Sequence, residues 1–306
     1  MICSFRPSFT RVAYSLAAML GTAAPALAAP FGGALYETFG AGGVTGIELA
    51  NSSIGVGVLK TPGTAIATGG STVYFASGDT VYSTNASLIG LTVFHRNNAA
   101  PAGLAVDTTG GFLYETFGAS SGVVAINLAN PATSAGVLRL AATSIVEGGG
   151  KVYFASGDTI YSANPNLTGV SIFHTNSAAT TGLALDAADG ILYDAFGAGG
   201  LVGLDLANPG HAVGILGLEA NNVAFGNGTV YFDSGDTIYA TNPDLVGLKA
   251  FHSNNAPVDG LALLPPVLGA SPGAAVPEPS ATGVIGLGLI GLARLHRRRR
   301  PSKAAG

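Results

Sequence analysis

The sequence contains few of the residues on which many protein classes depend. Its 306 residues include one Cys, no Trp and 10% charged side chains, whereas about 25% charged residues are usual. So little charge excludes a coiled coil, and it excludes a nucleic-acid-binding protein that works through a basic surface. The 48% of hydrophobic residues likewise excludes a disordered chain.

Long apolar runs are missing from the middle of the chain, which excludes a helical membrane domain there. They occur only at the two ends. Near the N-terminus, two arginines precede the apolar residues 12–20 and then Ala26-Leu27-Ala28. This order predicts a secretory signal peptide over residues 1–28, which signal peptidase would remove. The one cysteine, Cys3, lies in this segment, so the mature protein would have neither disulfides nor thiol chemistry.

A second apolar run, residues 281–293, lies near the C-terminus between two polar motifs. It follows Pro277-Glu278-Pro279 and precedes a basic cluster that contains Arg297, Arg298, Arg299 and Arg300. This order resembles the PEP-CTERM sorting signal, here over residues 276–306, with a short transmembrane helix at 281–295 and an Arg-rich tail.

The resemblance implies an exported protein of a Gram-negative envelope. The C-terminal helix would hold it in the inner membrane until an exosortase removes the tail, and the protein would then reach the cell surface or the extracellular matrix. A tail that is kept as a plain membrane anchor is the alternative, because the basic cluster would hold its end on the cytoplasmic side in either case.

Between these ends the sequence repeats itself three times. The motif Leu-Tyr-Glu-Thr-Phe-Gly at 35–40 returns at 113–118, and as Leu-Tyr-Asp-Ala-Phe-Gly at 192–197, with tyrosine spacings of 78 and 79 residues. A second motif, which begins Val-Tyr-Phe at residue 73, returns at 152 and 230. Three copies of about 79 residues therefore divide into six units of about 39.

Each unit reads as four short strands, because apolar and β-branched residues alternate between breaks of Gly, Asn, Asp or Pro. In two consecutive units the expected strands are 103–107, 112–117, 123–128 and 136–140, then 144–147, 152–155, 159–162 and 169–174. Four antiparallel strands per repeat of about 40 residues describe a propeller blade. The alternative, a parallel β-helix, would have a repeat nearer 20 residues.

The sequence thus predicts an all-β, six-bladed β-propeller over residues 29–266, followed by a linker at 267–275. Short helices are expected only in the signal and the tail. The candidate innermost strands begin near residues 64, 103, 143, 182, 221 and 260. The last of them follows the last complete set of strands, so we expect it to close the ring by completing the first blade. Residues 103–114 resemble the NHL and YWTD-like six-bladed families, a likeness that names no activity.

Two sets of polar residues recur with the repeat. The spacing of His95, His174 and His252 puts them on the outermost strands of alternate blades, too far apart to share a metal ion, whose ligands lie about 2 Å from it. We expect the acidic residues that follow the motif tyrosines to form hydrogen bonds between blades rather than to bind a ligand. These residues are Glu37, Glu115 and Asp194.

A functional site is best sought where the repeat is broken. At aligned positions the last repeat gains three polar residues. Glu219 stands where the other two copies have Pro62 and Ala141, and Asn222 stands where they have Ala65 and Ser144. Asp259 stands where they have Ala102 and Thr181. All three should lie near the channel mouth, and oxygen ligands of this kind suit Ca²⁺ or Mg²⁺. The hypothesis is a weak cation site or polar-ligand site there, with no other cofactor, and drift at an exposed loop is the alternative.

These observations favour an exported propeller without catalysis, which binds a surface glycan or protein or serves as a structural component. The alternative is an envelope hydrolase or lyase with a metal ion at the channel mouth, which needs acidic residues from several blades. The predicted signal and tail hold eight of the 13 basic residues and one of the 17 acidic residues. Without them the net charge falls from −4 to −11, which suits cationic partners and disfavours anionic polymers.

Overall fold

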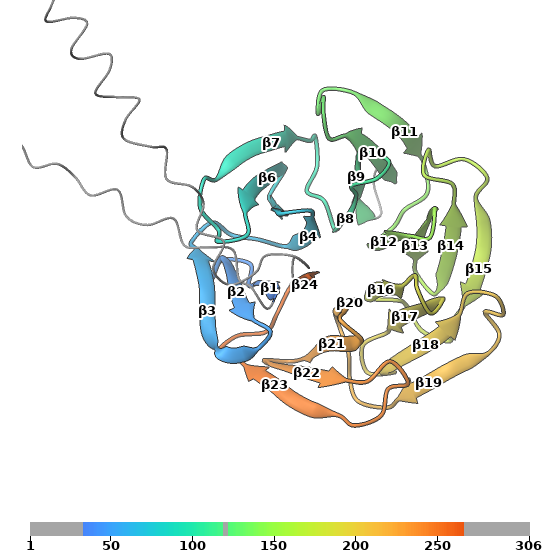
Figure 1. The fold of residues 1–306 in the computed structure, drawn as a ribbon. Coiled ribbons are helices and arrows are strands. Elements are labelled where there is room, and N and C mark those ends of the chain that lie inside the picture. The colour runs from blue at the N-terminus through green and yellow to red at the C-terminus, as the bar shows by residue number, and fades with distance from the viewer. Residues whose placement is uncertain (1–32, 119–121, 266–306) are drawn as a thin grey trace, which may run out of the picture.

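The computed structural model describes residues 33–118 and 122–265, which form six four-stranded antiparallel sheets arranged around a central channel (Figure 1). The predicted all-β, six-bladed propeller is confirmed. Within these ranges, no helix is long and apolar enough to cross a membrane. The predicted signal peptide, linker and tail helix lie outside the described residues.

Blades 1, 2 and 3 each place one short strand at the axis and three more strands successively farther out. From the axis outward, blade 1 consists of β24 (Gly260–Leu264), β1 (Ala34–Thr38), β2 (Val44–Glu48) and β3 (Asn51–Leu59). Blade 2 consists of β4 (Ala65–Gly69), β5 (Thr72–Ser77), β6 (Thr80–Asn85) and β7 (Thr92–Arg96). Blade 3 consists of β8 (Gly103–Asp107), β9 (Phe112–Thr116), β10 (Val123–Asn127) and β11 (Ser134–Leu138).

The other three blades follow the same order. Blade 4 consists of β12 (Ser144–Gly148), β13 (Lys151–Ser156), β14 (Thr159–Ala163) and β15 (Ser171–Thr175). Blade 5 consists of β16 (Gly182–Asp186), β17 (Ile191–Ala195), β18 (Leu201–Asp205) and β19 (Ala212–Leu216). Blade 6 consists of β20 (Val223–Gly226), β21 (Thr229–Ser234), β22 (Thr237–Thr241) and β23 (Lys249–Ser253).

The ring is closed by β24, the last strand within the described residues, as predicted. β24 pairs antiparallel with β1, from Ala34 opposite Leu264 to Thr38 opposite Gly260. Each innermost strand contacts the next one around the axis, and β20 contacts β24. The closure leaves no innermost strand without a neighbour. Because Ala34 and Leu264 are paired, the described chain begins and ends on the same face of the disc.

The motif tyrosines explain why the repeat spans two blades. Tyr36, Tyr114 and Tyr193 are fully buried, and the hydroxyl groups of the last two donate to the carbonyl oxygens of Pro165 and Pro243 at 2.9 and 3.1 Å. Each tyrosine of an odd-numbered blade therefore holds the outer loop of the following blade.

Candidate functional site

The repeated histidines do not form a site. His95, His174 and His252 lie on the outermost strands β7, β15 and β23, as the repeat predicted. In the part of the chain that the structure describes, no group of three or more His, Cys, Asp or Glu side chains is placed to hold a metal ion.

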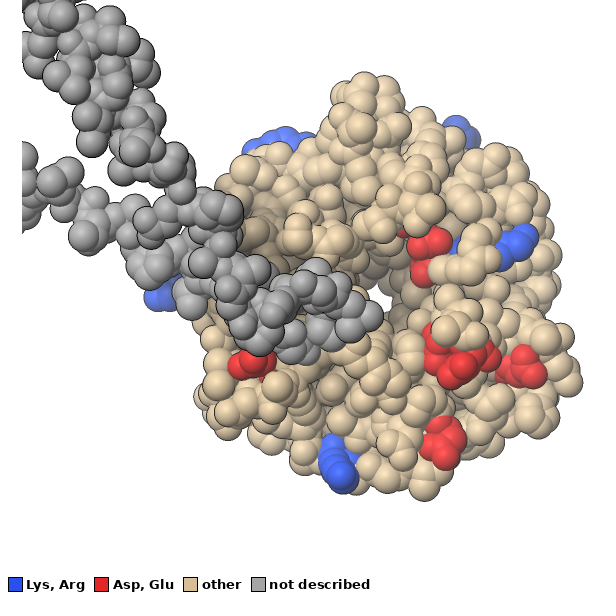
Figure 2. Space-filling view, in the orientation of Figure 1, with Lys and Arg blue, Asp and Glu red and all other residues tan. Residues whose placement is uncertain are grey.

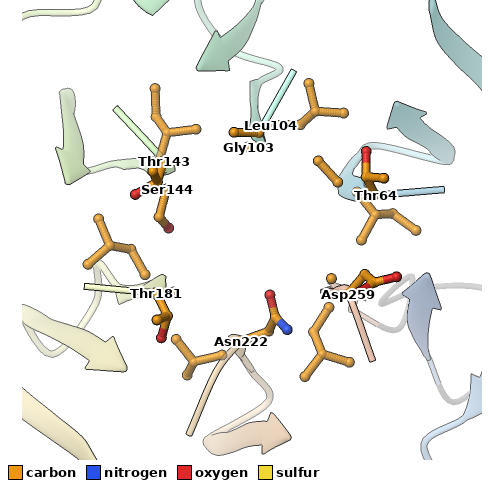
Figure 3. Close-up of a pocket in the computed structure, with 17 residues that line it drawn as sticks. Thr64, Gly103, Leu104, Thr143, Ser144, Thr181, Asn222 and Asp259 are labelled. Atoms are coloured by element: carbon orange, nitrogen blue, oxygen red, sulfur yellow. The ribbon is translucent and has the colours of Figure 1, made fainter. Parts of the chain in front are cut away.

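The channel mouth is a hollow of about 80 Å³ where the chain enters the six innermost strands. Hydroxyl groups dominate its polar lining, and one amide and one carboxyl group join them (Figure 3). The polar residues are Thr64, Thr143, Ser144, Thr181, Asn222 and Asp259. The mouth thus offers mostly neutral hydrogen-bonding groups.

The structure brings two of the three predicted site residues to this mouth. Asn222 and Asp259 line it, whereas Glu219 is exposed outside the lining, with its carboxylate 3.5 Å from the Asn221 amide. The Asn222 side chain is directed toward the centre of the hollow, and the Asp259 carboxyl group is directed away from it (Figure 3). A side chain on Gly40 would collide with this carboxyl group, since an added Cβ would lie 2.9 Å from it. The three predicted residues therefore do not converge on one ion.

Below the mouth a ring of aliphatic side chains surrounds the channel. One aliphatic side chain from each innermost strand lines both the mouth and a second hollow of about 220 Å³ beyond it. These side chains are Ile66, Leu104, Ile145, Leu183, Val223 and Leu261. The second hollow contains Glu147, which the sequence reasoning missed. Burial, with a smaller effect from the negative charge of Asp107, raises the pKa of Glu147 to about 7.

The acidic residues that follow the motif tyrosines lie between blades. Asn254, which follows blade 6, donates to Glu37 of blade 1 at 2.7 Å, and Asn176, which follows blade 4, donates to Asp194 of blade 5 at 2.6 Å. These bonds confirm the predicted hydrogen bonds between blades for Glu37 and Asp194. The equivalent residue Glu115 has no hydrogen bond to a described residue, although the nearby amide of Asn97 lowers its pKa.

Burial makes these three carboxyl groups weak acids. It raises the pKa of Glu37 and Glu115 to about 7 and that of Asp194 to about 6, and the nearby asparagine amides lower these values in part. Desolvation disfavours the charged form of a carboxyl group. All three are fully buried, and none of them lines the channel.

The sequence reasoning missed a fourth buried carboxyl group, that of Asp233 on β21, which is 1% exposed. Its pKa is raised to about 6 by burial, against the lowering effect of Asn222. A signal was present, because the second motif has Ala76 and Ala155 at this position in its first two copies. The residues on both sides of Asp233 are the same in all three copies, so the change at this one position is easily overlooked.

The comparison with protein families concerns the C-terminal end. Residues 275–300 match the PEP-CTERM protein-sorting motif. The chain carries a PEP-CTERM motif. This motif is typical of exported proteins that an exosortase processes, so it supports export and membrane-anchored sorting through the tail. Its residues lie outside the described ranges.

The propeller is similar to solved structures of other proteins. A chain in the crystal structure of a nidogen/laminin complex matches with a TM-score of 0.67 and 15% identity, over 76% of this chain and 98% of that chain. At this identity the likeness shows the fold alone. In total 1461 solved chains match, so the fold is widespread and names no activity. No curated protein matches the sequence.

Proposed function

We propose that this chain is an exported cell-surface or matrix protein whose propeller binds a partner without catalysis, and that signal peptidase and an exosortase process its two ends. The observation that carries this proposal is the PEP-CTERM motif at residues 275–300. The acidic character of the body fits an extracellular role, because net charge far from zero keeps a protein soluble.

The placement of the chain ends supports the channel mouth as the binding face. The mouth lies where the innermost strands begin, and β24 ends at Leu264 on the opposite face. The tail follows that end. With the tail in the inner membrane, or at the surface where it was cut, the mouth would open away from the attachment point.

The chemistry of the mouth favours a neutral, hydroxyl-rich ligand such as a glycan. Thr64, Thr143, Ser144 and Thr181 offer hydroxyl groups, and Asn222 offers an amide that is directed into the hollow. Figure 2 shows the face opposite the mouth, where the acidic groups gather over the blades of β12–β19 and the basic groups lie at the rim. An anionic polymer would be repelled by that opposite face.

The hydrolase or lyase alternative gains no support from this geometry. It needs carboxyl groups from several blades that meet at the axis. Within the described part of the mouth Asp259 is the one carboxyl group, and it is directed away from the centre. We therefore propose the binding role alone.

The binding proposal is tested with the extracellular polysaccharide of the cells that make this protein. Isothermal titration should show binding to the wild-type protein and about a tenfold weaker affinity for Asn222→Ala, because one or two hydrogen bonds are lost. Asn222→Ala restores the alanine of the first repeat, Ala65, so the fold should tolerate it. The matched control is Glu219→Ala, which should leave binding unchanged. No binding by the wild type would exclude the glycan, and equal binding by Asn222→Ala would exclude the mouth.

A further inference from the structure

Three polar residues that break the threefold repeat lie near one seam, the interface between blade 6 and blade 1. Asn222, Asp233 and Asp259 occupy positions that hold Ala, Ser or Thr in the other copies. The ring is closed at this seam, since β24 completes blade 1 beside β20 of blade 6. Random drift would spread such residues over all three copies, so their gathering indicates a local role.

Two carboxyl side chains face the inside of this seam from opposite blades. Glu37 shares its face of β1 with Leu35, and Asp233 shares its face of β21 with Tyr231, since side chains two residues apart lie on the same side of a strand. Leu35 and Tyr231 belong to one core cluster, which extends across the seam. Glu37 is 0% exposed and Asp233 is 1% exposed, so both carboxyl groups are shielded from solvent.

Each carboxyl group has one oxygen with a partner and one oxygen without. Glu37 Oε2 accepts from Asn254 at 2.7 Å, and Asp233 Oδ1 accepts from the backbone N–H of Asn222 at 2.8 Å. Glu37 Oε1 and Asp233 Oδ2 are buried, and no described residue donates a hydrogen bond to them. Buried polar atoms without a partner are rare in proteins and call for a ligand or a proton.

The two groups also lack a compensating positive charge among the described residues. Neither forms an ion pair there, and the negative charge of Asp233 adds to burial in raising the pKa of Glu37. Two buried carboxylates of like charge are costly without a cation. The equivalent seams avoid this cost, because Glu115 and Asp194 occur there with Ala76 and Ala155 in place of Asp233.

We propose that the seam between blade 6 and blade 1 binds a Ca²⁺ ion between Glu37 and Asp233, and that the ion locks the closed ring. Carboxylate oxygens are the ligands that Ca²⁺ prefers, and Ca²⁺ accepts irregular geometry and loses its water more readily than Mg²⁺ does. The seam lies beside the channel mouth, because the backbone of Asn222 bonds to Asp233 and that of Asp259 bonds to Thr38, next to Glu37. This inference does not depend on the glycan proposal.

The test measures the melting temperature of the full-length chain at about pH 8, above the raised pKa values, with CaCl₂ or with a chelator. Ca²⁺ should raise the melting temperature of the wild type by about 5 °C or more, as expected for a ligand well above its Kd. The increase should vanish in Asp233→Ala, which restores the alanine of the other repeats and should fold, and in Glu37→Gln. It should persist in Glu115→Gln, the matched change in an equivalent seam, and in Asp259→Ala at the mouth.

Three results would overturn the proposal. If the wild type gains no stability from Ca²⁺ and is stabilised only by acid, the two carboxyl groups share a proton instead of a metal ion. If Asp233→Ala keeps the full Ca²⁺ response, the ion binds elsewhere. Loss of the response in Asp259→Ala alone would likewise move the site to the mouth. Isothermal titration with CaCl₂ alone on the same variants gives the stoichiometry, and the proposal requires one site per chain.

Discussion

At the scale of single residues, the propeller carries acidic side chains in places where most proteins have apolar ones. Glu37, Glu115, Asp194 and Asp233 are all at most 1% exposed. Asparagine amides and a backbone N–H satisfy part of their hydrogen-bonding capacity, but burial still favours the protonated forms. The interfaces between blades are therefore sensitive to protonation.

Because these carboxyl groups bind protons more tightly in the folded chain than in the unfolded chain, we expect the free energy of unfolding to fall as the pH rises. The pKa of Glu37 is raised from 4.5 to about 7 and that of Asp194 from 3.8 to about 6, so the folded chain binds protons that the unfolded chain has released. In chelator, the free energy of unfolding should fall as the pH rises from about pH 4 to about pH 8, because each pKa raised by about two units removes about 3 kcal/mol of stability over this range.

Denaturant unfolding at a series of pH values measures this dependence. The double variant Glu37→Gln, Glu115→Gln should flatten the curve, because two of the titrating groups are removed. A wild-type stability that rises from about pH 5 to about pH 8 would show that these carboxyl groups are not held in their protonated forms.

At the scale of strands and blades, β24 decides whether the ring closes. It supplies the innermost strand of blade 1, and its buried residues Leu261, Leu263 and Ala262 pack into core clusters on both sides. Without it the edge of β1 and the flank of β20 would both be open.

A chain that ends at residue 259 should therefore lose the cooperative unfolding of the propeller, or lose more than about 5 kcal/mol of stability, since several large side chains leave the core. A chain that ends at residue 275 keeps all of the described strands and is the matched control, which should melt like the full chain. Circular dichroism during heating compares the two. Equal melting of both truncated chains would contradict the closing role of β24.

The strands also show how far the sequence alone could predict this fold. Three innermost strands begin at the residues expected for them, 103, 182 and 260. These starts could be predicted because the Gly-Leu-Ala pattern marks a break followed by a buried strand. The outermost strands were expected at 136–140 and 169–174, and they lie at 134–138 and 171–175. In these blades the pairing between the third strand and the outermost strand contains a register shift. Such a bulge changes which residues pair without changing the pattern of apolar residues.

The candidate site was predicted less well than the fold. Repeat alignment placed Asn222 and Asp259 at the mouth correctly, but it could not show that their side chains are directed differently or that Glu219 lies outside. Which way a side chain points depends on local turns that the repeat does not encode. Glu147 was missed because it sits in an ordinary strand pattern, and its environment comes from other blades.

At the scale of the whole molecule, the chain combines an acidic propeller with a basic, apolar tail. The described chain ends on the face opposite the channel mouth, so attachment through the tail would leave the mouth free. The near-neutral charge of −4 for the whole sequence averages an acidic body and two basic ends.

The central claim, that the tail directs an exported propeller, is tested most directly by locating the protein in cells with and without residues 276–306. Intact cells are treated with a protease, and the propeller is followed by an epitope inserted at residue 210. We expect a protease-sensitive propeller at the surface of wild-type cells, and a propeller retained in the periplasm or released without processing when the tail is deleted. The same surface location for both chains would contradict it.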